Sequence, residues 1–482
     1  MTEKPQNRPY DVTDKYSIWE YSKKLIDKTL EEAVGEELNE DNSGKGRLGQ
    51  MVERYFFGYE PNSNPTPDFE EAGVELKCTP LKELSNHDLQ IKERLVCSMI
   101  DYSEEHKHSF KESRVYIKCA MMLLLFYLHR SKVPVQQLKF IYSVLWQIPE
   151  KDLLIMEQDY GKIVDKIRSG KAHELSEGDT TYLGACRKGQ KGDSDVYYTL
   201  PDGKQCEIPA PKRAFSLKPQ YMRTILEFIK KYGAKAAMNT PAIVKGYGGK
   251  ELISEDELRK QSFEDILLER FRQYIGKSYS ELCSLFGLEE TKAKNKYYLI
   301  ANAILTMQGI RGDDVKKSDE FQKSGIRIKT IRLQKSGRPK EAMSFENIDY
   351  FDILQEDNWY ESRLYELFSS RFLFIVFQDC GCDGKIDYRL QEAFFWTMPS
   401  NDLKSAETYW QNIKCNVAAN KIGPEHFYRE GEHKKFHVRP KAKNSYDLAI
   451  NPNGGMSKKY CYWFNHEYVQ SIVEGYNKTQ LE

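Results

Sequence analysis

The chain has 482 residues, enough for two to four domains of about 100–200 residues each. With 40% hydrophobic and 30% charged residues it has the composition of a globular protein, which excludes a disordered chain. Lysine and arginine number 72 and aspartate and glutamate also number 72, so the overall charge neither favours nor excludes a polyanionic partner.

The sequence shows no sign of export or of a membrane anchor. The N-terminus is polar, the longest apolar run (residues 119–128) is too short to span a bilayer, and ten scattered cysteines do not form a disulfide framework. We therefore expect a cytoplasmic protein with no membrane partner.

Hydrophobic periodicity predicts alternating helices and strands along the whole chain. Apolar residues at helical spacing predict helices at residues 48–57, 221–231 and 262–271, the last with Ser262 as N-cap. Alternating or continuous apolar residues predict strands at residues 73–78, 121–127 and 372–377. The predicted fold class is mixed α/β (α+β), with central mixed sheets flanked by helices.

An internal repeat divides the chain. Residues 68–81 are echoed by residues 320–333 at a shift of 252 positions, with identical phenylalanine, glycine, lysine and leucine residues at four of the fourteen places. Arg187 and Arg439 are related by the same shift. We therefore predict two related tandem domains, 1–240 and 262–482, joined by a Gly-rich linker at 241–261. The alternative is one large domain with fortuitous similarities.

Charged residues gather around the first copy of the repeat. Glu75 and Lys77 project from one face of the predicted strand, Asp68 precedes that strand, and Glu53 lies fifteen residues before Asp68. Converging carboxylates suit Mg²⁺, which proteins usually hold by one or two carboxylates together with a substrate phosphate. Such a metal can activate water, and a nearby lysine can stabilise developing charge. The alternative is a solvated strand face, because this spacing alone is a weak pattern.

The surroundings of these residues resemble those of the MutH-like nucleases. The segments KGRLGQMVERYFFG (45–58) and DFEEAGVELKCTP (68–80) carry the resemblance, followed by GKAHELSEGDTTYL (170–183) and RAFSLKPQYM (213–222). This family includes the mismatch-repair endonuclease MutH and larger two-domain restriction endonucleases that cut GATC, which the chain resembles along nearly its whole length. The resemblance implies two tandem domains of the MutH and type II restriction-endonuclease kind.

The resemblance also implies roles for single residues. The metal-binding carboxylates fall on Asp68 and Glu75, the catalytic lysine on Lys77, an additional helix glutamate on Glu53 and a second lysine on Lys118. The base-reading arginine falls on Arg187. The tyrosine that MutH uses to sense methylation is Ser216 here, so recognition of hemimethylated DNA is not implied.

Local charge is consistent with a DNA surface in the first half. Residues 187–235 contain eleven lysines and arginines against five acidic residues. Lys188 and Lys218 would contact phosphates, which set affinity, whereas Arg187 would make a bidentate contact to a guanine edge. The alternative is a plain solvated loop.

The second copy of the repeat has lost the acidic pattern. Glu320 stands in place of Asp68, Arg327 in place of Glu75 and Leu305 in place of Glu53, while Lys329 alone persists. Residues 321–340 contain seven bases and no acid, and residues 434–443 contain five bases and no acid, among them Arg439 and Lys441. We expect a domain that binds DNA without cutting it, or else a degenerate structural partner.

Together these observations predict a Mg²⁺-dependent type II restriction endonuclease that cuts double-stranded DNA, at GATC according to the resemblance. The second domain would bind another copy of the site as effector, and the protein would be a monomer that can pair on DNA. The host would need a cognate GATC methyltransferase to protect its own DNA. The alternatives are a MutH-type nicking endonuclease of mismatch repair and a non-catalytic DNA-binding regulator.

Overall fold

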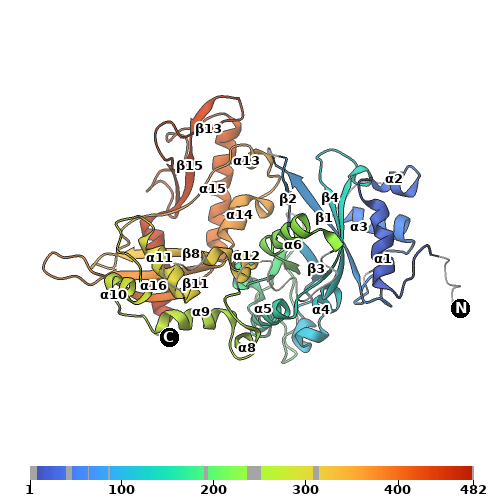
Figure 1. Cartoon of the computed structure of the whole chain (residues 1–482), viewed down its shortest axis with the longest axis horizontal. Coiled ribbons are helices and arrows are strands. Elements are labelled where there is room, and N and C mark those ends of the chain that lie inside the picture. Colours follow the sequence, from blue (N-terminus) through green and yellow to red (C-terminus); the bar gives the residue numbers. More distant parts are fainter. Residues whose placement is uncertain are drawn as a thin grey trace. The chain divides into compact units, whose positions relative to one another are not determined.

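The computed structural model describes residues 8–38, 46–62, 64–84, 87–188, 194–235, 251–307 and 314–479 (Figure 1). The chain forms two compact units. Unit 1 comprises Met1–Phe263 and Lys316–Gly325, and unit 2 comprises Glu264–Val315 and Ile326–Glu482. Lys316–Gly325, which belongs to the second half of the sequence, thus lies in the first unit. Residues 241–250 of the predicted linker lie outside the described ranges, and the linker limits stay a prediction.

Unit 1 is built on a mixed four-stranded sheet of order β2-β1-β4-β5, in which β1 and β4 are parallel and the outer pairs antiparallel. The strands are β1 (Glu75–Glu83), β2 (Leu89–Ile91), β4 (Met121–Leu128) and β5 (Phe140–Gln147). A hydrophobic cluster packs this sheet against the N-terminal helices. These are α1 (Lys15–Ser22), α2 (Leu30–Val34), α3 (Arg47–Met51) and the π-helix that continues α3 (Val52–Phe57).

A second, three-stranded antiparallel sheet of unit 1 has the order β3-β7-β6. Its strands are β3 (Leu95–Met99), β7 (Arg213–Leu217) and β6 (Leu183–Arg187). The remaining helices of the unit are α4 (Arg114–Cys119), α5 (Glu150–Arg168), α6 (Pro219–Tyr232), α8 (Glu255–Leu258) and α12 (Asp319–Ser324). The amphipathic pattern that predicted residues 221–231 as a helix arises because α6 buries one face, including Tyr221, Ile225 and Ile229.

Unit 2 repeats this plan with two three-stranded sheets, of orders β11-β10-β8 and β12-β15-β9, and a small β13-β14 hairpin. The strands are β8 (Arg327–Leu333), β9 (Met343–Asn347), β10 (Phe372–Asp379), β11 (Tyr388–Trp396), β12 (Phe436–Pro440), β13 (Leu448–Ile450), β14 (Met456–Lys458) and β15 (Tyr460–Phe464). The helices are α9 (Phe263–Arg272), α10 (Tyr279–Phe286), α11 (Lys296–Thr306), α13 (Asp352–Gln355), α14 (Arg363–Phe368), α15 (Ser400–Ala418) and α16 (His466–Thr479).

The two units share their strand connections. β1 runs parallel to β4, as β8 does to β10. On its other side β4 pairs with β5, and β10 pairs with β11, both antiparallel. The helices α5 and α15 are both 19 residues long, and α6 and α16 are both 14 residues long. The mixed α/β fold class is thereby confirmed, and the predicted strands at 121–127 and 372–377 are buried because each is a central strand of its sheet.

No helix in the described parts of the chain combines the length and the apolar character needed to cross a membrane.

Candidate active site

A tight turn in unit 1 brings Asp68 beside Glu75. Phe69 and Val74 exchange both backbone hydrogen bonds, at 2.9 and 3.1 Å, and Gly73 within the turn has a φ of 65°, which favours glycine. The N–H of Asp68 donates to Glu75 Oε2 at 3.3 Å, and the N–H of Leu76 donates to Asp68 Oδ2 at 2.9 Å. The turn thus places two carboxylates together at the start of β1.

Two lysines converge on Glu75, whose side chain is almost completely buried. Lys77, two residues along the same strand face, donates from Nζ to Glu75 Oε1 at 2.6 Å. Lys118, from the last turn of α4, donates from Nζ to both oxygens of the same carboxylate at 3.2 Å. Burial is the largest single effect on Lys77 and disfavours its charged form, but Glu75, Cys119 and Asp68 together raise the pKa of the ammonium above its ordinary value. Lys77 therefore carries positive charge at the carboxylate.

Glu53, on the π-helix, completes the acidic group. Burial, together with the charges of Asp68 and Glu75, raises the pKa of Glu53 to about 7. Burial and then Glu75 raise the pKa of Asp68 to about 6. These raised pKa values reflect the electrostatic repulsion among carboxylates in a largely buried site, which a bound cation would reduce.

The donor set fits Mg²⁺ in part. Within the described residues no three histidine, cysteine, aspartate or glutamate side chains are grouped as metal ligands. Magnesium, however, is commonly held by only one or two carboxylates with water and substrate phosphate in the remaining positions. Asp68 and Glu75 provide these two carboxylates: the turn holds them together, and the charge of Glu75 raises the pKa of Asp68.

Arg187 and Lys188 lie where β6 runs into a loop. Arg187 is the last residue of β6 and is exposed, opposite Arg213 of β7. The N–H of Lys188 donates to the carbonyl of Lys212 at 2.7 Å, which closes the base of the loop. Lys218 is placed differently, because it is buried and its ammonium donates to the carbonyl of Thr180. This placement favours a structural role for Lys218 over the predicted phosphate contact.

Asp159 on α5 holds the other end of β6 and was not identified from the sequence. Its buried carboxylate accepts hydrogen bonds from the N–H groups of Thr181 and Tyr182, both at 2.6 Å, and of Leu183 at 2.9 Å. A signal was present, since Asp159 lies among the apolar residues of the buried face of α5, such as Ile155 and Ile163. Three charge-assisted bonds fix the start of the strand that ends at Arg187.

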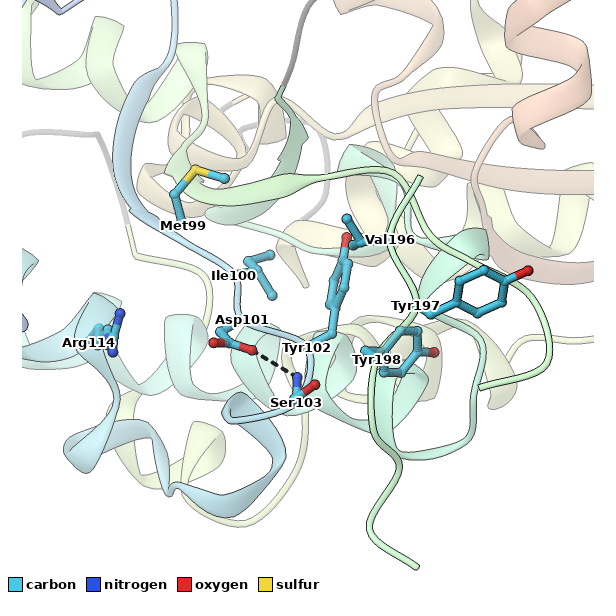
Figure 2. Close-up of a pocket in the computed structure, with 9 residues that line it drawn as sticks. All are labelled: Met99, Ile100, Asp101, Tyr102, Ser103, Arg114, Val196, Tyr197 and Tyr198. Carbon is cyan, nitrogen blue, oxygen red and sulfur yellow. Dashed lines mark hydrogen bonds between the residues drawn. The ribbon is translucent and has the colours of Figure 1, made fainter. Parts of the chain in front are cut away.

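A pocket of about 360 Å³ lies apart from these acidic residues (Figure 2). It is lined by residues 99–103, residues 196–198 and Arg114, and Asp101 accepts a hydrogen bond from the N–H of Ser103 at 3.1 Å. Figure 2 shows Tyr197 pointing away from Tyr198. None of the candidate catalytic residues lines this pocket, so the pocket does not locate the chemistry.

In unit 2 an ion pair replaces the acidic group. Arg327, at the start of β8, donates from Nη1 to Glu346 Oε1 at 2.8 Å, and Arg363 donates to the other oxygen of Glu346 at 2.9 Å. Lys329 donates to the carbonyl of Ser344 at 2.6 Å. The repeat partner of Glu53, Leu305, is fully buried in α11.

The predicted DNA-binding residues of unit 2 lie at the end of β12. Arg439 is exposed, with its guanidinium 5.2 Å from the ring centroid of Trp463 and 3.9 Å from Glu430. Lys441 donates to the hydroxyl of Ser344 and to a backbone carbonyl, both at 3.0 Å. Arg439, the last residue but one of β12, thus lies close to the strand end, as Arg187 does at the end of β6.

Comparison with known proteins identifies the family of the chain. The family model of the DNA mismatch repair enzyme MutH matches twice, at residues 57–159 and 313–407. The type II restriction enzyme Sau3AI of Staphylococcus aureus is 32% identical over 507 aligned positions, which cover 94% of this chain and 98% of that enzyme. The chain belongs to the MutH-like nuclease family. Within that family it is a site-specific deoxyribonuclease of the type II restriction class.

The MutH proteins themselves match a smaller part of the chain. MutH of Shewanella woodyi is 27% identical over 182 positions, which cover 38% of this chain and 76% of that protein. MutH of Shewanella amazonensis is 30% identical over 132 positions, covering 27% of this chain and 57% of that protein. The double match of the family model confirms the tandem repeat, including the half whose acidic residues are replaced.

Proposed function

We propose that this restriction endonuclease makes Mg²⁺-dependent double-strand breaks in DNA at GATC sites. The observation that carries the proposal is the convergence of Asp68, Glu75, Lys77 and Lys118 within one hydrogen-bonded group. The GATC target is supported by the resemblance to the two-domain enzymes of the family.

In the proposed reaction Asp68 and Glu75 would hold the cation, which would supply a Lewis acid and lower the pKa of a water molecule. Lys77 and Lys118 lie within hydrogen-bond distance of Glu75, so they place positive charge where a scissile phosphate would develop negative charge. Glu53, in the same acidic group, would add a third carboxylate beside the cation.

Recognition and protection complete the proposal for unit 1. Arg187 reads a guanine edge from the end of β6, and Lys188 contacts phosphate beside it. Such an enzyme requires a GATC methyltransferase in the same host, and it would act in the cytoplasm, where the DNA that it cuts lies.

Unit 2 is proposed to bind a second GATC site as an allosteric effector. The support is the exposed Arg439 at the strand end together with the loss of acidic residues at Arg327 and Leu305. Effector DNA can accelerate cleavage only if it binds better to the active state of the chain. A plasmid with one GATC site should then be cut faster when a short GATC duplex is added, and Arg439→Ala should abolish that acceleration. Equal rates in the wild type would leave unit 2 as a clamp or scaffold.

The proposal is tested by incubating the purified chain and Mg²⁺ with unmodified plasmid and sequencing the ends. Double-strand breaks at GATC support it. Single-strand nicks would support a MutH-type nicking enzyme, and intact DNA would support a non-catalytic regulator.

A further inference from the structure

Tyr59 lies beside the acidic group in unit 1 and is held from both sides of it. Its N–H donates to the carbonyl of Glu53 at 3.1 Å. Its ring meets the ring of Phe69, the neighbour of Asp68, edge to face, with the centroids 5.4 Å apart at an interplanar angle of 80°. The guanidinium of Arg8 lies 5.5 Å from the ring centroid of Tyr59. The ring is therefore fixed by the same segments that carry Glu53 and Asp68.

The hydroxyl of Tyr59 is buried and has no hydrogen-bond partner within the described parts of the chain. Other tyrosines of the same aromatic cluster are paired, since Tyr10 donates to the carbonyl of Phe57 at 2.7 Å and Tyr21 to that of Phe56 at 3.3 Å. Buried hydroxyls are nearly always hydrogen-bonded, because an unpaired one loses its interaction with water without compensation. The exception at Tyr59 needs a functional explanation.

The charges around Tyr59 identify the kind of partner. Burial, and after it the charges of Asp68 and Glu53, raise the pKa of the phenol well above its ordinary value. The hydroxyl thus keeps its proton and can donate a hydrogen bond. After burial, the carboxylates of Asp68 and Glu53 have the largest effect on the phenol, and Asp68 already accepts at Oδ2 from the N–H of Leu76.

We propose that Tyr59 is a positioning residue whose hydroxyl donates to the Asp68 carboxylate in the metal-loaded site and orients it toward the cation. Carboxylate ligands of metals are themselves usually hydrogen-bonded, and loss of such a second partner commonly weakens metal binding about 10- to 100-fold. The inference rests on the proposed Mg²⁺ site and goes beyond it by assigning a residue that does not touch the metal.

The test compares Tyr59→Phe with the wild type in two measurements. The first is the melting temperature without metal, which should be unchanged or slightly raised, because the variant removes a hydroxyl that has no partner. The second is Mn²⁺ affinity of the full chain, measured by calorimetry with MnCl₂, since Mn²⁺ accepts the same oxygen ligands as Mg²⁺. The affinity should fall about 10-fold.

Tyr21→Phe is the matched control, because it removes a paired hydroxyl from the same aromatic cluster. It should lower the melting temperature and leave Mn²⁺ affinity unchanged. Equal Mn²⁺ affinities of Tyr59→Phe and the wild type would overturn the inference alone, and so would a lower melting temperature of Tyr59→Phe without metal. Absence of Mn²⁺ binding by the wild type would overturn the metal site and the inference together.

Discussion

Lys151 donates from Nζ to Glu320 Oε1 at 2.7 Å, in the interior of unit 1. Glu320 also accepts from the N–H groups of Leu252 and Ile253, at 3.2 Å each. By the repeat, Glu320 is the counterpart of the proposed metal ligand Asp68. A carboxylate at this place in the second copy has thus become an internal anchor that keeps α12 in unit 1.

A second buried group of charged residues, one lysine and two aspartates, also holds α12 and gives a stability prediction. Lys323 donates from Nζ to Asp152 at 2.9 Å and to Asp319 at 2.7 Å. Lys323→Met should lower the free energy of unfolding by about 3–5 kcal/mol, because it leaves buried carboxylates without their counter-charge. Urea denaturation measures the change.

The exposed Lys317, six positions earlier, supplies the control for that experiment. Lys317→Met should change the free energy of unfolding by less than about 0.5 kcal/mol, as is usual for surface substitutions. If Lys323→Met were equally mild, the buried cluster would not be what holds α12.

The raised pKa values of Glu53 and Asp68 predict how stability depends on pH without metal. A carboxyl with a raised pKa holds more protons in the folded than in the unfolded chain between its ordinary pKa and the raised one. Stability should therefore fall as pH rises from about 4.5 to about 7, the pKa of Glu53. Melting temperatures across that window should fall less steeply for Glu53→Gln. Parallel curves for the variant and the wild type would contradict the shift.

Replacement of Asp68 and replacement of Glu75 should both abolish cleavage but should differ in their effect on the stability of the fold. Asp68→Asn should abolish cleavage with little loss of stability or of DNA binding, because it removes a metal ligand and no ion pair. Glu75→Gln should abolish cleavage and also destabilise the fold, since Lys77 and Lys118 lose their shared carboxylate. Cleavage assays combined with thermal melts separate the two effects. Substantial activity in Asp68→Asn would show that the site is misplaced.

Readout by Arg187 should be separable from phosphate binding. Arg187→Ala should cost about 1–3 kcal/mol of discrimination between GATC and a site with one changed base, as expected for a bidentate base contact. Lys188→Ala, at the neighbouring residue assigned to a phosphate, should weaken binding to all sequences and reduce the salt dependence. Binding titrations at several salt concentrations distinguish these results. A uniform loss with Arg187→Ala would make Arg187 a phosphate contact.

The sequence predicts best what depends on local geometry. Glu75 and Lys77 are two residues apart, so the strand period alone puts them on one face, and their 2.6 Å contact agrees with that prediction. Lys118 reaches the same carboxylate from the end of α4, just before β4, and β4 pairs in parallel with β1. The resemblance named Lys118 as a site residue, but no local pattern shows this long-range relationship.

Burial that depends on distant contacts was not predictable in the same way. In the sequence Lys218 is one of eleven lysines and arginines in residues 187–235. In the structure its buried ammonium donates to the carbonyl of Thr180. Likewise α12 follows the predicted linker in sequence but belongs to unit 1, through partners about 170 residues away on α5. Pairings of this kind depend on tertiary packing, which periodicity and composition do not encode.

The most direct measurement is end sequencing of unmodified plasmid DNA treated with Mg²⁺ and either the wild type or Asp68→Asn. The account predicts that the wild type breaks both strands at GATC and that Asp68→Asn, although it still binds, leaves every strand intact, because unit 2 has Arg327 and Leu305 at the positions of Glu75 and Glu53. Cleavage by Asp68→Asn, or wild-type ends at unrelated sequences, would contradict it.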